Sequence, residues 1–324
     1  MKVALIVLAA VVVLIGLLAF HLFSPLRVRP VPADFDCYDL GQGAYVPLEV
    51  PPHAFGIGLS YAGHIEETAS DFDPEASPPV FVKGPSATTR DGARAHLPTS
   101  DELIQTADAF EPGVGERLRA DFPSIKALLD YEVEMGLVLL EDIDPSRLGD
   151  PSFAPRLGFF IANDLSARSI AILGEGQADR YGYWGVSKSF PGFMPIADRA
   201  WVPAEAKANG IPCVEIETTV NGELRQRQST ASLIYTPRQM LGFVHAAFPD
   251  GPLAAGTIVL TGTPGGVAMK TPRWLVRFGN LLGLNRFKKL SAKLRGDTAR
   301  FLDVGDEVTV QGRGLGKVTV TIAP

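Results

Sequence analysis

Two glutamates in one otherwise apolar stretch place the strongest restriction on how this 324-residue chain can fold. Glu132 and Glu134 flank Val133 and are followed by the apolar run 135–140. Side chains of a β-strand point alternately to its two faces, so both carboxylates leave the same face. Buried side by side, they repel each other and lose hydration unless a cation neutralises them. The pattern therefore predicts either a buried strand that binds a hard cation or an edge strand whose acidic face is in water.

A third carboxylate follows another apolar stretch. Residues 158–162 predict a buried strand, and Asn163 and Asp164 come directly after it. Three carboxylates leave part of the coordination shell of a divalent cation open for water and substrate, as a catalytic site requires. We therefore predict that Glu132, Glu134 and Asp164 bind Mg²⁺, with Mn²⁺ or Ca²⁺ as alternatives.

The rest of the sequence predicts a mixed, strand-rich α/β domain over residues 54–324. Short apolar or alternating segments, bounded by Gly, Pro, Asn or Asp, lie at 55–59, 132–140, 157–162, 214–220, 257–261, 307–311 and 317–322. The best helix candidate is 236–247, with Pro237 in its first turn. The net charge of −6 excludes a broadly basic nucleic-acid-binding face. Cys37 and Cys213 belong to no metal or redox motif; the two could pair, but we expect both to be unpaired structural thiols.

Residues 1–23 predict a transmembrane anchor, followed by a linker and a first strand over 24–53. No charged residue occurs from Val3 to Phe20, and such a helix is about 27 Å long at about 1.5 Å per residue. A cleaved signal peptide is the alternative, but no small-residue cleavage site follows the run. We expect a single-pass membrane protein, and the basic residues at its two ends favour a cytoplasmic body only slightly.

Residues 273–300 form a basic segment with one acid, Asp297. Trp274, Phe278 and Phe287 are among the apolar side chains interleaved with its lysines and arginines. The pattern predicts two short amphipathic helices broken near Gly279 and Gly283. They are either a helical insertion packed on the body or, given the predicted anchor, a second contact with the lipid bilayer.

Six short segments, in order, resemble the fumarylacetoacetate hydrolase family, which includes acylpyruvate hydrolases and hydroxydiene-dioate isomerases. They are Gly58-Leu59-Ser60-Tyr61-Ala62-Gly63-His64, Asp130-Tyr131-Glu132-Val133-Glu134, Asn163-Asp164-Leu165-Ser166-Ala167-Arg168, Lys188-Ser189-Phe190, Val220-Asn221-Gly222-Glu223 and Leu260-Thr261-Gly262-Thr263-Pro264-Gly265-Gly266-Val267. The resemblance implies the family's β-roll catalytic domain and a homodimer. It also implies that Glu132, Glu134 and Asp164 are the metal ligands.

The same resemblance implies further roles. His64 matches a histidine that accepts a proton from water, and Glu67 matches the glutamate that orients it. Lys188 matches a lysine that stabilises enolate or carboxylate charge. The substrate-binding positions that it implies are Tyr61, Arg168 and Thr263.

The expected activity is hydrolysis of a carbon–carbon bond in a 1,3-dicarbonyl or acylpyruvate substrate, a small oxo acid or diketone. The same site could instead decarboxylate or tautomerise a 2-oxo dicarboxylate. The family commonly has Asp directly after its Ser-x-Arg and Gln two residues later, where this chain has Ser169 and Ala171. This departure leaves the substrate open, and it leaves a catalytically retired, membrane-tethered binding protein as a third reading.

Overall fold

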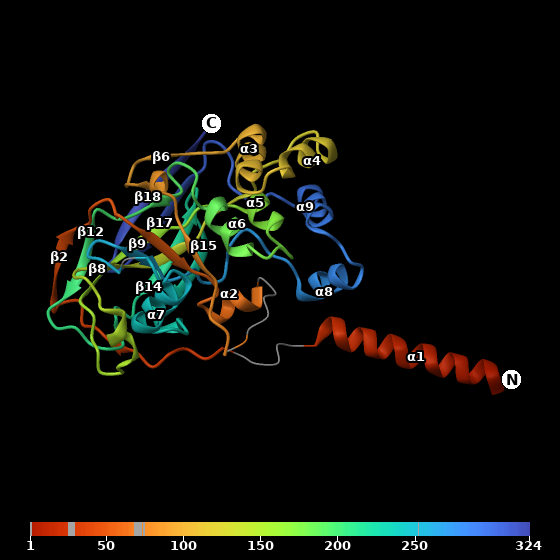
Figure 1. Cartoon of the computed structure of the whole chain (residues 1–324), viewed down its shortest axis with the longest axis horizontal. Helices are drawn as coiled ribbons and strands as arrows, with labels where there is room; N and C mark the ends of the chain where they lie inside the picture. The colour runs from red at the N-terminus through yellow and green to blue at the C-terminus, as the bar shows by residue number, and fades with distance from the viewer. Residues whose placement is uncertain (1, 25–29, 68–72, 74, 252) are drawn as a thin grey trace.

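A seven-stranded sheet runs through the body of the protein in the computed structural model (Figure 1). The structure describes every residue except 1, 25–29, 68–72, 74 and 252, and it leaves out the side chains of residues 2–10, 66 and 273. The strand order is β2-β12-β9-β8-β16-β3-β4. The strands are β2 Gly43–Pro47, β12 Arg199–Pro203, β9 Leu157–Asn163, β8 Val133–Leu139, β16 Ile258–Leu260, β3 Ala54–Ile57 and β4 Val80–Val82.

The middle strands of this sheet are covered on both faces. Every residue of β8 and β9 is buried, because both strands are almost wholly apolar. The two strands are antiparallel, and Val133 pairs with Asn163. Glu132 and Glu134 therefore lie in the interior of the protein, and the alternative of an edge strand with a wet acidic face is wrong.

A second sheet packs against β8 and β9. It contains five strands in the order β15-β14-β17-β18-β6, and β14, β17 and β18 contact the two central strands. Its strands alternate buried and exposed residues, so one face meets the core and the other meets water. The bounds are β15 Glu223–Ser229, β14 Glu215–Val220, β17 Glu307–Gly312, β18 Gly316–Ala323 and β6 Arg94–His96.

Three further pairs of short strands complete the β-structure in the described part of the chain. They are β1 Asp36–Cys37 with β13 Gly210–Ile211, β5 Thr88–Thr89 with β11 Met194–Pro195, and β7 Leu129–Asp130 with β10 Ser166–Ala167. With the two sheets they confirm the mixed, strand-rich α/β class.

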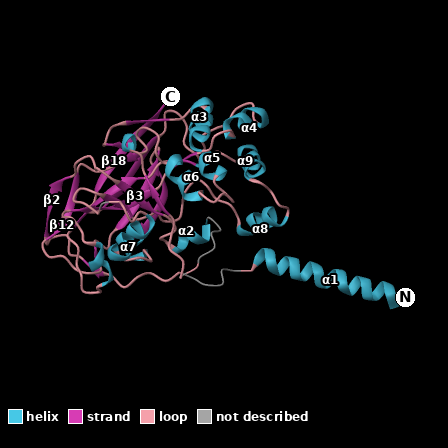
Figure 2. Ribbon diagram, in the orientation of Figure 1, coloured by secondary structure: helices cyan, strands magenta, loops and turns pink. Residues whose placement is uncertain are grey.

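The helices lie around the outside of the two sheets (Figure 2). They are α1 Lys2–Phe23, α2 Ala62–Glu67, α3 Ser100–Phe110, α4 Val114–Asp121, α5 Arg168–Leu173, α6 Arg180–Ser187, α7 Pro237–Ala247, α8 Arg273–Leu281 and α9 Arg286–Arg295. Helix α7 corresponds to the best helix candidate of the sequence, and Thr236 and Gln239 form a capping box at its start. Helix α3 was not predicted, although Thr99 and Glu102 form the same motif there.

The amino-terminal segment forms the helix α1, which projects from the body in Figure 1. Among the described residues, no helix has both the length and the apolar character needed to cross a membrane. On this finding the predicted transmembrane anchor over 1–23 is wrong, and with it the predicted membrane location.

The basic segment forms two helices, as predicted, but the break comes at Gly283 rather than at Gly279, which lies inside α8. Phe287 and Leu290 of α9 are buried in the core, and α9 packs on α5. This packing agrees with a helical insertion on the body. The alternative of a bilayer contact through 273–300 depended on the predicted anchor and loses its support with it.

The two cysteines form a disulfide between Cys37 and Cys213, so the expectation of unpaired thiols is wrong. The parallel pairing of β1 with β13 brings Cys37 next to Ile211 and the two cysteine Cα atoms to 5.2 Å. The bond joins positions 176 residues apart and fastens the chain before the first long strand to the body.

Candidate metal centre and active site

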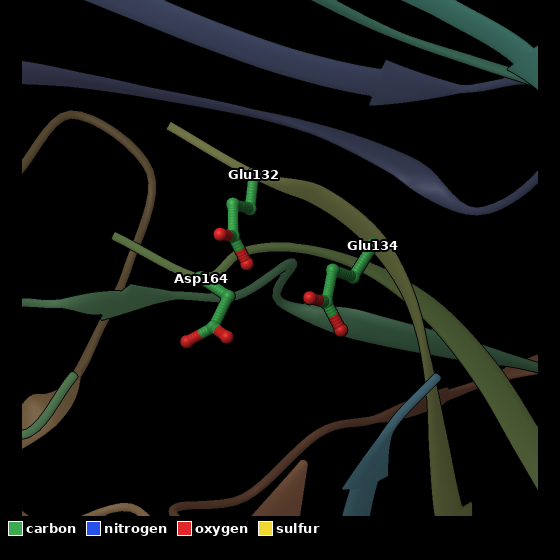
Figure 3. Close-up of side chains that lie close together, drawn as sticks. All are labelled: Glu132, Glu134 and Asp164. Atoms are coloured by element: carbon green, nitrogen blue, oxygen red, sulfur yellow. The ribbon is translucent and has the colours of Figure 1, made fainter. Parts of the chain in front are cut away.

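Three buried carboxylates face one another at the ends of β8 and β9 (Figure 3). Glu132 precedes β8, Glu134 is its second residue, and Asp164 follows β9. Because the strands are antiparallel in this register, the Asp164 N–H donates to the Glu132 carbonyl at 2.8 Å. One oxygen from each carboxylate lies within 4.8 Å of the other two. The structure thus brings together the three ligands that the sequence predicted.

The three acids have different electrostatic surroundings. Burial alone would raise the pKa of Glu132, but the charges of Arg168 and Lys188 outweigh it and lower that pKa to about 2. Burial raises the pKa of Glu134 well above its usual range, and the charges of Asp164 and Glu132 raise it further. The Glu134 carboxylate accepts a hydrogen bond from Gly262 N–H at 2.7 Å, and it makes no ion pair within the described residues.

The lack of a cationic partner for Glu134 fits the binding of a divalent cation at the three acids. Carboxylate oxygens are the ligands that Mg²⁺, Mn²⁺ and Ca²⁺ prefer, and the cluster contains no sulfur or imidazole ligand. A cation beside Glu134 would supply the charge that the described side chains do not. The Tyr61 hydroxyl is also buried and makes no hydrogen bond within the described part of the chain.

Three buried cations surround the acids. Lys188 Nζ donates to Glu132 at 2.7 Å and also to Asp164. Arg168 pairs with Glu132 and donates from Nε to Asp130 at 2.8 Å. Lys83 pairs with Asp164 and donates to the Phe193 carbonyl at 3.0 Å. Burial lowers the pKa of Lys83, and the charge of Asp164 opposes this change.

His64 and Glu67, both on α2, join the same cluster. Burial lowers the pKa of His64, although the charge of Glu132 opposes the change, so the imidazole is neutral near pH 7. Glu67 accepts a hydrogen bond from Gly266 N–H at 2.6 Å and pairs with Lys270 at 2.5 Å. The glycine-rich turn after β16 therefore holds Glu67 beside the histidine.

The remaining predicted residues divide between the site and its support. Burial raises the pKa of Tyr61, and the charge of Glu134 raises it further, so Tyr61 keeps its proton next to the acids. The Thr263 hydroxyl instead donates to the Val133 carbonyl at 3.1 Å and accepts from Gln226 at 2.9 Å. Thr263 thus uses its hydroxyl to hold β8 in place.

Sequence reasoning missed Lys83, Asp130 and Gln226. Lys83 directly follows the apolar strand β4, just as Asp164 follows β9, and this shared position was an available signal. Asp130 accepts hydrogen bonds from Ala268 and Met269 N–H groups at 2.7 and 3.1 Å and holds the turn against the site. Gln226 gave no local signal, because its partners come from other strands.

A cavity of about 600 Å³ lies between β3, β4 and the end of α7, and it reaches the site only at Lys83 among the residues described so far. Phe55, Val82, Lys83 and Phe248 are among its lining residues, and none of the three carboxylates is. It is mainly an apolar surface hollow. Chemical character therefore places the candidate site at the acids rather than in this cavity.

The fold and the acidic cluster define a metal-dependent enzyme with a strand-rich α/β body. Residues 53–323 match the family model described as "Fumarylacetoacetate (FAA) hydrolase C-terminal". The chain belongs to the fumarylacetoacetate hydrolase family, which confirms the resemblance drawn from the sequence.

Relatives and solved structures agree with this assignment. An uncharacterized protein of Archaeoglobus fulgidus is 29% identical over 240 residues, which cover 72% of this chain and 78% of the relative. The structure of fumarylpyruvate hydrolase from Pseudomonas aeruginosa, in complex with Mn²⁺ and pyruvate, is similar at a TM-score of 0.54 and 18% identity, covering 94% of this chain and 99% of that one. A 5-carboxymethyl-2-hydroxymuconate delta-isomerase from Mycobacterium smegmatis matches at 0.50 and 23%, covering 87% and 81%. At these identities, the two structures show the fold.

Proposed function

We propose that residues 54–324 form a divalent-metal-dependent hydrolase that cleaves a carbon–carbon bond in an acylpyruvate or another 1,3-dicarbonyl substrate. The observation that carries the proposal is the juxtaposition of three buried carboxylates, two buried lysines and a neutral histidine. Such a site can bind a chelating oxo acid, activate water and stabilise an enolate. The pyruvate and Mn²⁺ in the related Pseudomonas structure are consistent with this chemistry.

Glu132, Glu134 and Asp164 would hold the cation, for which we propose Mg²⁺ or Mn²⁺. When bound, the cation polarises the substrate carbonyl and offsets negative charge that develops on its oxygen. Arg168 keeps Glu132 ionised and fixed in place through its contacts with Glu132 and Asp130.

His64 serves as the general base. Its lowered pKa leaves the imidazole neutral, so it can take a proton from water at neutral pH. Glu67, held by Gly266 and Lys270, orients the histidine and favours the imidazolium that forms. The water oxygen adds to the acyl carbonyl carbon as its proton moves to His64.

The carbon–carbon bond next to that carbonyl then breaks, and its electron pair becomes the enolate of pyruvate. Lys188 and Lys83, which both pair with Asp164, would stabilise the charge of this enolate. The Tyr61 hydroxyl has a hydrogen bond left to donate to the substrate. Proton return from His64 to the enolate carbon yields pyruvate and a carboxylic acid and restores the neutral base.

Decarboxylation or tautomerisation of a 2-oxo dicarboxylate is the second candidate. A base beside an enolate-stabilising site also suffices for these reactions, and one structure of similar fold is an isomerase. The products distinguish the candidates: hydrolysis releases pyruvate and an acid, decarboxylation releases CO₂, and tautomerisation conserves mass.

The test uses the full chain and a panel of acylpyruvates and oxaloacetate, with enol absorbance and product chromatography as readouts. We expect Mg²⁺- or Mn²⁺-dependent release of pyruvate that stops with a chelator and in His64→Ala. The matched control is His53→Ala, because His53 is an exposed histidine. Full activity of His64→Ala, or turnover insensitive to chelator, would contradict the mechanism.

A further inference from the structure

Two partly buried cations of the basic segment 273–300 contact the glycine-rich turn and the residues directly after it. Lys293, on α9, donates from Nζ to the Lys270 carbonyl at 3.1 Å. The Arg300 Nη2 atom is 3.5 Å from the Gly266 carbonyl oxygen and 3.5 Å from the Tyr131 hydroxyl. All of these acceptors are neutral.

Neither cation has a carboxylate partner within the described residues. The Arg300 Nε atom is buried and makes no hydrogen bond there. Burial lowers the pKa of Lys293, and the nearby charge of Asp130 opposes the change without forming an ion pair. Lys83, Lys188 and Arg168, by contrast, each pair with an acid. Cations withdrawn from water need a counter-charge, so this pair is suited to bind an anion.

The position of the pair connects it with the reaction site. The segment 266–270, which both cations contact, also holds Glu67 through Gly266 N–H at 2.6 Å. Lys293 Nζ is 5.6 Å from the centre of the Phe301 ring, and Phe301 is the neighbour of Arg300 in the chain. The two cations therefore contact one short segment, residues 266–270, whose Gly266 and Lys270 both interact with Glu67.

Helix α9 holds Lys293 in a defined place. Arg286, at its start, pairs with Glu111 at 2.5 Å, and Lys289 pairs with Glu175 at 2.8 Å. Phe287 and Leu290 are buried in the core beneath it. A charge fixed in this way binds a ligand without the ordering that a mobile surface lysine would require.

We propose that Lys293 and Arg300 form an anion subsite that binds a carboxylate at the far end of the substrate. This inference rests on the proposed hydrolase function and narrows its substrates to acylpyruvates whose acyl group ends in a carboxylate. The basic segment then acts as a specificity element of the enzyme.

The test compares two acylpyruvates of equal length, one ending in a carboxylate and one in the corresponding amide. Lys293→Met/Arg300→Met should lower kcat/KM for the carboxylate about ten- to a hundredfold and for the amide less than about threefold, as expected for lost charge-assisted hydrogen bonds. The single substitution Lys293→Arg keeps the positive charge and should retain most of the preference for the carboxylate over the amide. The matched control is Lys288→Met/Arg295→Met, because both residues are exposed on the same helix.

An equal loss for both substrates, or an unchanged preference, would overturn the proposal. A second measurement is the shift of Tm that succinate causes in the presence of a chelator. It tests the anion subsite without enzyme activity, so failure of the subsite proposal can be told apart from failure of the hydrolase proposal. If the wild-type chain hydrolyses no diketone, the hydrolase proposal fails. A succinate shift that the double substitution removes would still support the anion subsite, and a shift that survives it, or no shift at all, would overturn it.

Discussion

Replacing Glu134 with Gln should stabilise the metal-free protein and abolish its response to metal. The Glu134 carboxylate lies within 4.8 Å of two other acids and makes no ion pair among the described residues. At an effective dielectric constant of about 20, one like-charge pair at that distance costs about 3.5 kcal/mol. Lys188 offsets part of this repulsion. Gln can still accept the hydrogen bond from Gly262, so we expect a net gain of about 1–3 kcal/mol in the free energy of unfolding.

The stabilisation by Glu134→Gln should depend on pH. Because folding raises the pKa of Glu134, the folded state retains this proton at pH values where the unfolded chain has lost it. The wild-type protein without metal therefore loses stability as the pH rises above about 4.3, the unfolded value for Glu. The loss continues until the pH passes the raised folded value. The advantage of Glu134→Gln should thus be small near pH 4 and large near pH 8.

Urea unfolding with a chelator, at both pH values, measures this difference. Glu116→Gln, at an exposed position, is the matched control and should change little. Added Mg²⁺ should stabilise the wild type, by about 2.7 kcal/mol at a hundredfold excess over Kd, and should leave Glu134→Gln almost unchanged. A variant that is less stable than the wild type at pH 8 without metal, or that responds fully to Mg²⁺, would refute the reasoning.

Three further predictions concern the support of the site and of the fold. Gln226→Ala removes the hydrogen bonds to Val133 N–H and to the Thr263 hydroxyl, so it should lower the free energy of unfolding by about 2–4 kcal/mol and weaken Mg²⁺ binding. Urea titration measures the first effect and calorimetry the second. Gln228→Ala, at an exposed position, is the control and should change neither. Reduction of the disulfide of Cys37 should lower the urea midpoint by the equivalent of about 2–5 kcal/mol, and a Cys37→Ser variant that is insensitive to reductant is the control. Thr99→Ala removes the cap of α3 and should cost about 1 kcal/mol in thermal unfolding; no change would mean that packing alone holds this helix.

Local patterns in the sequence determined seven of the twelve strands of the two sheets, the best helix and two of the three acids. The period of two along β8 placed Glu132 and Glu134 on one face, and this needed no knowledge of distant residues. The apolar run of β9 and the cap before α7 were visible in the same way. The capping box of Thr99 and Glu102 before α3 is equally local, so the start of this helix could also be predicted from the sequence.

Other features became visible only in three dimensions. Whether β8 was an edge strand or a central one depended on which strands flank it, and the pairing with β9 and β16 decided this. The contact between Lys83 and Asp164 joins positions 81 residues apart, and the disulfide joins positions 176 apart. The predicted anchor shows the reverse case, in which an apolar run suggested a membrane span that the described helices do not support.

The physical reason is the range of the forces involved. Backbone alternation and helix caps act over two to four residues, so local patterns were enough to predict the two central strands, the best helix and the shared face of the two glutamates. Charge pairing and burial act through space. Distant segments must come together before it is decided that two lysines and one arginine pair with Glu132 and Asp164, while Lys293 and Arg300 have no carboxylate partner among the described residues.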